Sequence, residues 1–84
     1  MIIGQVVISK NGRDKSRLFI VLRVEDDYIY LSDGKNRLIG KPKKKKIKHV
    51  QCTNTVIDLS ETGNRGLQDS DIRKWLLPFQ NKEV

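Results

Sequence analysis

The residues with the most evident chemistry in this 84-residue chain are the lysines of one short segment, "GKPKKKKIKH". Six lysines fall within eight positions there: Lys41, Lys43, Lys44, Lys45, Lys46 and Lys48. Ammonium groups at this density attract polyanions, of which RNA, DNA and anionic lipid are the usual candidates. Because lysine is a mobile point charge without planar bidentate geometry, the run suits phosphates better than base edges. A solvated charged loop and a nuclear localisation signal are the alternative interpretations.

Further cations occur in two turn segments that precede the run, residues 10–17 and 33–37. They are Lys10, Arg13, Lys15, Arg17, Lys35 and Arg37. Residues 1–54 carry 13 Lys/Arg against five Asp/Glu, and residues 55–84 carry four against five, so the formal net charge of +7 arises in the first two thirds. Loops of an antiparallel meander alternate between its two ends, which places both turn segments at one end. Eight extended residues reach about 26 Å and a five-residue strand only about 17 Å, so the run can lie along the sheet and connect both segments.

Other candidate site residues are few. Tyr28 and Tyr30 alternate with apolar residues in "YIYLS" and could point outward to stack on bases. The alternative, which we favour, is that both simply pack against the protein. His49 and Cys52 are two isolated ligand types without a partner pair, so we expect no metal site. No catalytic triad, paired carboxylates or phosphate-binding glycine loop occurs at useful spacing, and the sequence predicts neither an enzyme nor a cofactor.

Short strands must position these groups. Alternation and turn residues predict strands at 4–9, 18–25, 28–32 and 49–53, with a further short strand around 37–39. The expected core residues are Val6, Ile8, Ile20, Leu22, Ile29 and Leu31. Gly12 and the Asp33-Gly34 pair supply the backbone freedom that tight loops need. Five short strands without a helix between them favour a small, highly twisted barrel.

Residues 55–84 have a different character, with a polar connector followed by a predicted helix at about 69–77. Asp69 or Ser70 is expected to cap this helix, and Pro78 to limit its extension. Ile72, Trp75, Leu76 and Phe79 follow an i, i+3, i+4, i+7 spacing and form one apolar face. We expect this face to pack on the barrel of residues 1–54.

The segment "IGQVVISKNGRDKSRLFIVLRV" resembles the KOW family of ribosomal proteins and transcription elongation factors. The later "YIYLSDGKNR" and "KHVQCT" look most like its large-subunit ribosomal branch of archaeal and eukaryotic type, so the similarity covers about residues 2–54. Carried over by position, Gly4 opens the first strand, Gly12 is the loop glycine and Asp14 lies in the loop. Arg17-Leu18 start the second strand and Asp33-Gly34 form the later turn. Ser16 stands where the family usually has a second loop glycine.

This resemblance implies an SH3-like barrel that binds RNA, often ribosomal RNA. The leading hypothesis is therefore a cytoplasmic, monomeric RNA-binding protein that holds structured RNA and acts in translation, with the ribosome as the partner that the resemblance implies. A protein-interaction module that uses the barrel face or the C-terminal helix is the alternative. A membrane partner is disfavoured, because the lysine run has no lipidation motif or basic amphipathic helix beside it. The first residues also lack the basic start and long apolar stretch of a secretory signal.

Overall fold

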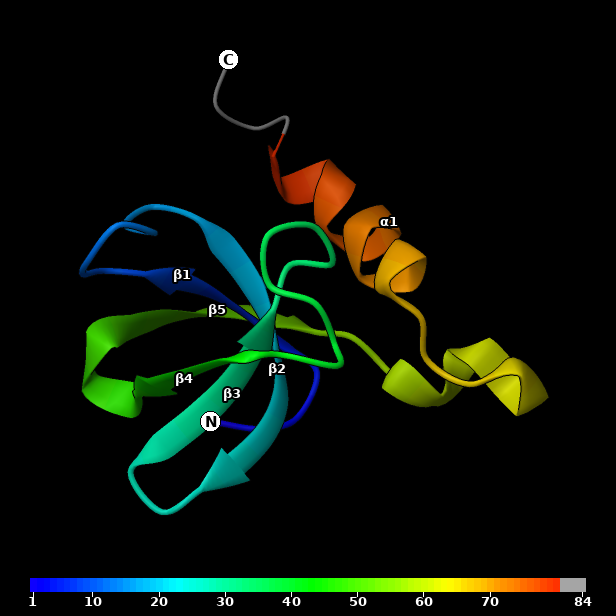
Figure 1. Cartoon of the computed structure of the whole chain (residues 1–84), viewed down its shortest axis with the longest axis horizontal. Helices are drawn as coiled ribbons and strands as arrows, with labels where there is room; N and C mark the ends of the chain where they lie inside the picture. The colour runs from blue at the N-terminus through cyan, green and yellow to red at the C-terminus, as the bar shows by residue number, and fades with distance from the viewer. Residues whose placement is uncertain (81–84) are drawn as a thin grey trace.

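The computed structural model describes residues 1–80, which fold into one antiparallel sheet and a C-terminal helix (Figure 1). The strands are β1 (Gln5–Ser9), β2 (Leu18–Glu25), β3 (Tyr28–Ser32), β4 (Lys43–Lys46) and β5 (Val50–Val56). Two 3₁₀ segments, η1 (Ile47–His49) and η2 (Leu59–Arg65), precede the helix α1 (Asp69–Gln80). The predicted mainly β class with one C-terminal helix is confirmed. The last four residues of the predicted 55–84 segment lie outside the described residues.

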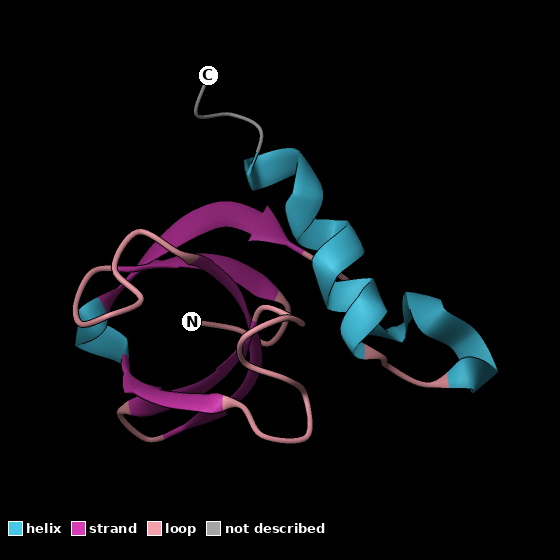
Figure 2. Ribbon diagram, turned by 45° about the horizontal axis from the view of Figure 1, so that its top comes forward, coloured by secondary structure: helices cyan, strands magenta, loops and turns pink. Residues whose placement is uncertain are grey.

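The sheet has the strand order β4-β3-β2-β1-β5 and curls strongly around its inner face (Figure 2). β4 and β5 are its two edges, and the short η1 turn connects them. Within residues 1–80 no ladder of backbone hydrogen bonds joins these edges, so the sheet is curled but not closed into a barrel. The small five-stranded barrel expected from the sequence is thus an open, strongly curled sheet.

The predicted fourth strand at 37–39 is wrong, and the lysine run itself forms β4. Asp33 explains the difference, because its Oδ1 accepts the backbone N–H groups of residues 35, 36 and 37 at 2.8–2.9 Å. The Ser32 hydroxyl also donates to the carbonyl of Arg37 at 2.7 Å. These bonds close residues 33–37 into a turn, so the chain can pair with β3 again only at Lys43.

Both faces of the sheet are buried around β1 and β2, so the predicted core residues divide between two clusters. The inner cluster contains Val7, Phe19, Val21, Ile29, Leu31 and Val50. The outer cluster contains Val6 and Ile20 together with Ile72 and Leu76 of α1. Of the predicted core residues, Ile8 and Leu22 are only half-buried. The register of β2 and β3 shifts between Val21 and Arg23, and this irregularity turns Val24 toward the inner cluster.

Helix α1 packs on the outer face of the sheet, as its apolar spacing predicted (Figure 1). Its first turn is stabilised by Asp71, whose Oδ2 accepts the backbone N–H of Gln68 at 2.9 Å. Asp69 was an expected cap, but its Oδ1 accepts the backbone N–H of Ile39 at 2.7 Å and so ties the helix to the loop before β4. The helix also continues past Pro78 and ends at Gln80, beyond the predicted end at 77.

Candidate nucleic-acid interface

The lysine strand, β4, presents its four lysines alternately to the two faces of the sheet. Tyr28 pairs with Lys46 and Tyr30 with Lys44, whereas Ile29 pairs with Lys45 and Leu31 with Lys43. Directly opposed residues of an antiparallel ladder point to the same face. Lys44 and Lys46 therefore share the outer face with the tyrosines and are exposed, while Lys43 and Lys45 follow the buried Ile29 and Leu31 inward.

Lys45 is a buried residue, which contradicts the interpretation of the whole run as solvated charge. Its side chain is only 8% exposed, and its Nζ lies 2.9 Å from Asp14 Oδ1. The same Nζ donates to the carbonyl oxygen of Asn11 at 2.8 Å, and the hydroxyl of Ser9 donates to Asp14 Oδ1 at 2.8 Å. Asp14 and Asn11 both belong to the loop between β1 and β2, so Lys45 fixes this loop against the opposite edge of the sheet.

The electrostatics of Asp14 reflect this environment. Burial alone would raise the pKa of its carboxyl, but the hydrogen bonds from Lys45 and Ser9 outweigh that effect. The positive charges of Lys45 and Lys43 act in the same direction and hold the pKa of Asp14 below its usual value. Asp14 Oδ2 is buried and is the one such side-chain oxygen or nitrogen in residues 1–80 without a hydrogen-bond partner. The ammonium group of Lys45 therefore provides most of the stabilisation that offsets the cost of burying the Asp14 carboxylate.

The tyrosine–lysine face consists of Arg23, Tyr28, Tyr30, Lys44 and Lys46 on the outer side of β2, β3 and β4. The guanidinium of Arg23 lies 4.2 Å from the centroid of the Tyr30 ring, and Lys44 Nζ lies 4.5 Å from that of Tyr28. Cations at this separation interact favourably with the π face of an aromatic ring. The tyrosines lie on the outer face, and their rings pack against these cations of the protein itself. Base stacking on them stays a prediction.

The arginine pocket lies at the end of the sheet where the two basic turn segments meet. It has a volume of about 360 Å³, and its lining includes Arg13, Arg17, Arg37 and Lys43. The alternation of loops predicted that the 10–17 and 33–37 segments would come together here. Lys43 was predicted only as part of the run, but it belongs to both the lysine strand and this pocket. Asp14 and Asp33 also line the pocket, Asp14 paired with Lys45 and Asp33 with backbone N–H groups of its own turn.

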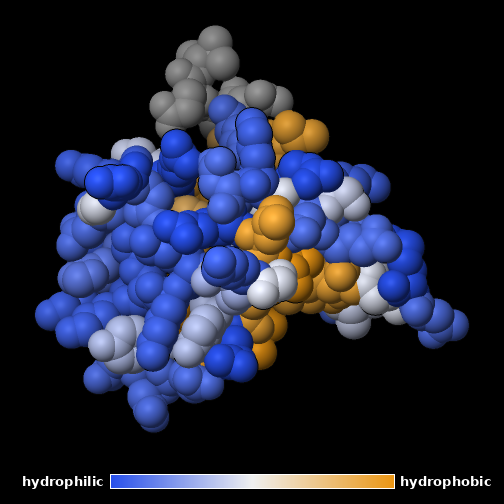
Figure 3. Space-filling model, viewed as in Figure 1, coloured by the Kyte–Doolittle hydropathy of each residue, from blue (hydrophilic) through white to orange (hydrophobic). Residues whose placement is uncertain are grey.

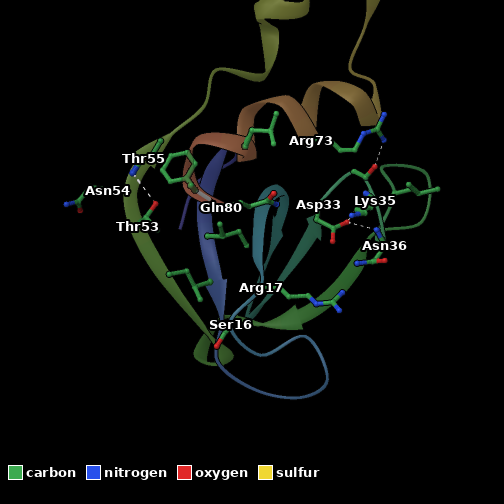
Figure 4. A pocket seen from close by; sticks show the side chains of 16 residues that line it. Ser16, Arg17, Asp33, Lys35, Asn36, Thr53, Asn54, Thr55, Arg73 and Gln80 are labelled. Atoms are coloured by element: carbon green, nitrogen blue, oxygen red, sulfur yellow. Dashed lines mark hydrogen bonds between the residues drawn. The ribbon is translucent and has the colours of Figure 1, made fainter. Parts of the chain in front are cut away.

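The helix groove is a larger depression of about 1430 Å³ between α1, the 33–38 segment and strands β1, β2 and β5. Arg17, Asp33 and Asn36 line both the groove and the arginine pocket, so the two are continuous. Figure 4 shows Arg17 extending from the start of β2 toward the turn that carries Asn36. Arg73 reaches from α1 to the same turn and donates to the carbonyl oxygen of Gly34 at 2.6 Å. Sequence reasoning missed Arg73, because its position depends on how the helix docks.

The remaining predicted cations are more dispersed. Lys10, Lys15, Lys41 and Lys48 are exposed and line neither the pocket nor the groove, whereas Lys35 lines the groove. Lys48 lies in η1 and Lys41 in the turn before β4. The loop glycines adopt the expected left-handed conformation, with φ of 81° at Gly12 and 72° at Gly34. Ser16 has a φ of 73°, a conformation in which glycine would be less strained.

The other candidate ligands do not form a cluster. His49 belongs to η1, where a strand position was expected, and the thiol of Cys52 contacts Met1 Sδ at 3.6 Å. Across residues 1–80 no group of three or more His, Cys, Asp or Glu side chains is arranged to hold a metal ion. In the same part of the chain no helix is long and apolar enough to cross a membrane.

Hydrophilic side chains cover the sheet side of the molecule in Figure 3, and hydrophobic ones gather where the C-terminal segment meets the sheet. The comparisons with known proteins do not assign this surface a function. No protein-family model matches the chain, and no curated protein matches it significantly. The candidate interface therefore has to be judged from its own geometry and charge.

Proposed function

We propose that the protein binds structured RNA through phosphate contacts made by a basic surface that runs around the β4 edge of the sheet. The observation that carries this proposal is the position of β4 at the edge of the sheet. Lys43 points to its inner side and lines the arginine pocket, while Lys44 and Lys46 are exposed on its outer side. Four separate segments, residues 10–17, 33–37, β4 and the outer side of β2, supply cations to this surface. A lysine run that is only a solvated charged loop would not need cations from three other segments beside it.

The two parts of the surface support different contacts with a nucleic acid. Lys44 and Lys46 are exposed point charges along a strand, which suits a line of backbone phosphates. The arginine pocket gathers three guanidinium groups in a concave site, where their planar geometry can hold a phosphate with paired hydrogen bonds. A-form RNA is recognised mainly through phosphates, 2′-hydroxyl groups and exposed loops. A flat anionic membrane would engage the exposed lysines but not a recessed pocket.

The resemblance to the KOW family over residues 2–54 agrees with this proposal and makes ribosomal RNA in the cytoplasm the first RNA to test. The alternative, a protein-interaction module based on α1, is less well supported. Ile72 and Leu76, which would be the natural contact residues of a free amphipathic helix, are buried against the sheet. We therefore favour RNA as the partner and assign the protein no catalytic role.

The test is the salt dependence of binding to an RNA hairpin, measured by fluorescence anisotropy. If about five phosphates are neutralised, log K should fall with log salt with a slope of roughly −3.5 to −4.5. The double variant Lys44→Ala/Lys46→Ala should flatten this slope by about 1.4–1.8 units, since each contact contributes about 0.7–0.9. All four lysines should not be replaced together, because the loss of buried Lys45 would perturb the fold.

Lys74→Ala is the matched control, because Lys74 is an exposed lysine of α1 that lines neither the arginine pocket nor the helix groove. It should leave the slope almost unchanged. The proposal fails if the double variant binds with the wild-type slope. It also fails if vesicles of anionic phospholipid compete with the hairpin as well as unlabelled RNA does.

A further inference from the structure

The helix groove combines exposed apolar side chains with cations, a combination that phosphate binding alone does not explain. Leu38 is 44% exposed and Leu77 is 54% exposed, and both line the groove. Arg17, Lys35 and Arg73 line the same depression. Exposed apolar residues in a concave site with a few polar groups around them mark a binding site more often than a structural accident.

The size of the groove argues for an extended ligand. Its volume of about 1430 Å³ is above the ~300–1,000 Å³ typical of pockets for small molecules. The ligand must also present apolar surface and negative charge together. Unpaired nucleotides meet both conditions, because their bases are free to pack on side chains while their phosphates remain available to Arg and Lys. A duplex hides its bases and satisfies only the second condition.

The position of the groove gives such a strand a continuous path. Arg17, Asp33 and Asn36 connect the groove to the arginine pocket, and Lys43 connects that pocket to the lysine strand. The hydrogen bond from Arg73 to Gly34 holds a guanidinium at the edge of the groove, beside the turn that carries Asp33 and Asn36 (Figure 4). A nucleic-acid backbone that passed from the arginine pocket into the groove would therefore meet the cations Arg17, Lys35 and Arg73, while the Asp33 carboxylate between them is engaged by N–H groups of its own turn.

We propose that the helix groove binds an unpaired segment of RNA that continues from a helical part held by the lysine strand. This inference rests on the proposed RNA-binding function and adds a preference for junctions between paired and unpaired RNA. Leu38 and Leu77 contact the bases, and Arg17, Lys35 and Arg73 contact the phosphates. Sequence preference is weak, since packing against apolar side chains accepts any base.

The experiment compares three RNAs that share one hairpin stem. The first is blunt, the second carries a six-nucleotide single-stranded extension, and the third carries the same extension without bases. The base-bearing extension should tighten binding about tenfold over the blunt hairpin, which corresponds to roughly 55 Å² of apolar surface buried against Leu38 and Leu77. The abasic extension carries the same phosphates and should give only a minor part of that gain, mainly at low salt.

Leu38→Ser/Leu77→Ser should abolish the preference for the base-bearing extension and leave the affinity for the blunt hairpin unchanged. Ile2 and Ile3 are also exposed apolar residues but do not line the groove, so Ile2→Ser/Ile3→Ser is the matched control. Equal thermal stability of the two double variants would exclude unfolding as the cause.

Three outcomes overturn the inference and leave the proposed function standing. The base-bearing extension could add nothing, the abasic extension could do as well as the base-bearing one, or both double variants could keep the preference. An acidic amphipathic peptide is added as a competitor. If Leu38→Ser/Leu77→Ser weakens binding of the peptide but not binding of the RNA extension, the ligand of the groove is a protein segment and not RNA. If even the blunt hairpin fails to bind in a salt-dependent manner, the proposed function itself is wrong.

Discussion

Lys45 and Lys44 are adjacent in sequence, yet their replacement should lower the stability of the protein by very different amounts. Lys45→Met keeps the length and apolar character of the side chain but removes the Nζ that lies 2.9 Å from Asp14 Oδ1. Asp14 then keeps only the hydrogen bond from Ser9, while its Oδ2 already has no partner. Removal of one member of a buried ion pair typically costs about 3–5 kcal/mol. Lys44→Met, at an exposed position, should cost less than about 1 kcal/mol.

The penalty should also depend on pH, with a sign that follows from Asp14. Because the native pKa of this carboxyl is lowered, its contribution to stability is present above the unfolded pKa of about 3.9 and is lost as the pH falls through the native value. In Lys45→Met the ammonium group that does most to lower the pKa is gone, and burial favours the protonated acid. The difference in unfolding free energy between wild type and variant should therefore be largest near pH 7, and it should shrink as the pH falls through the higher native pKa of the variant toward the lowered native pKa of the wild type.

Urea unfolding followed by the fluorescence of Trp75 measures both quantities, since Trp75 is half-buried and packs against the outer core cluster. Equal penalties for Lys45→Met and Lys44→Met at pH 7 would refute the assignment of Lys45 as a buried, paired residue. A large penalty for Lys45→Met that persists unchanged at low pH would mean that lost packing, and not an uncompensated carboxylate, causes the destabilisation.

Two further stability predictions concern the docking of α1, and urea unfolding tests both. Gly34→Ala should cost at least ~2 kcal/mol, because Gly34 has a φ of 72° and an added Cβ would collide with the backbone carbonyl of Asp69. Gly40→Ala should be nearly neutral, since nothing lies within 4 Å of a Cβ there, and equal effects at the two glycines would contradict the packing of the helix on the turn. Leu76→Ala should cost about 2–5 kcal/mol because Leu76 is fully buried between α1 and the sheet. Leu77→Ala, one residue further along, should change stability by less than about 0.5 kcal/mol, and a reversed order would mean that the opposite side of the helix faces the sheet.

Four of the five strands and the amphipathic helix could be predicted because their signals are local. Alternation in "LFIVLRVE" and the spacing of Ile72, Trp75 and Leu76 are visible within a few residues. The inner and outer faces could not be assigned in the same way. β1 and β2 carry apolar residues on both faces, because α1 covers the outside of the sheet, and period-2 patterning gives no direction when both faces are buried.

The lysine strand was missed for a related reason. Four consecutive lysines have no intrinsic preference for strand and no visible alternation, so β4 owes its conformation to pairing with β3. The side chain of Lys45 points inward because it pairs with Asp14, which is 31 residues away in the chain. The gathering of Arg13, Arg17 and Arg37 was easier to anticipate, because loop alternation in a meander is a property of connectivity. The helix groove was not, since Leu38, Arg73 and Leu77 meet only after the helix has docked.

Successive lysines of β4 point to opposite faces of the sheet, so one run of lysines can have three different structural roles. As an edge strand, β4 presents unpaired backbone groups, and lysine side chains discourage pairing with another chain. Lys44 and Lys46 remain exposed, as the proposed phosphate contacts require, whereas the stem of Lys45 can pack on the inner face beside Ile29 while its ammonium group reaches Asp14. That contact holds the β1–β2 loop, which carries Arg13 and Arg17 to the arginine pocket. Loss of Lys45 should therefore weaken RNA binding indirectly, through a loosened pocket, so only the outward lysines report on phosphate contacts themselves.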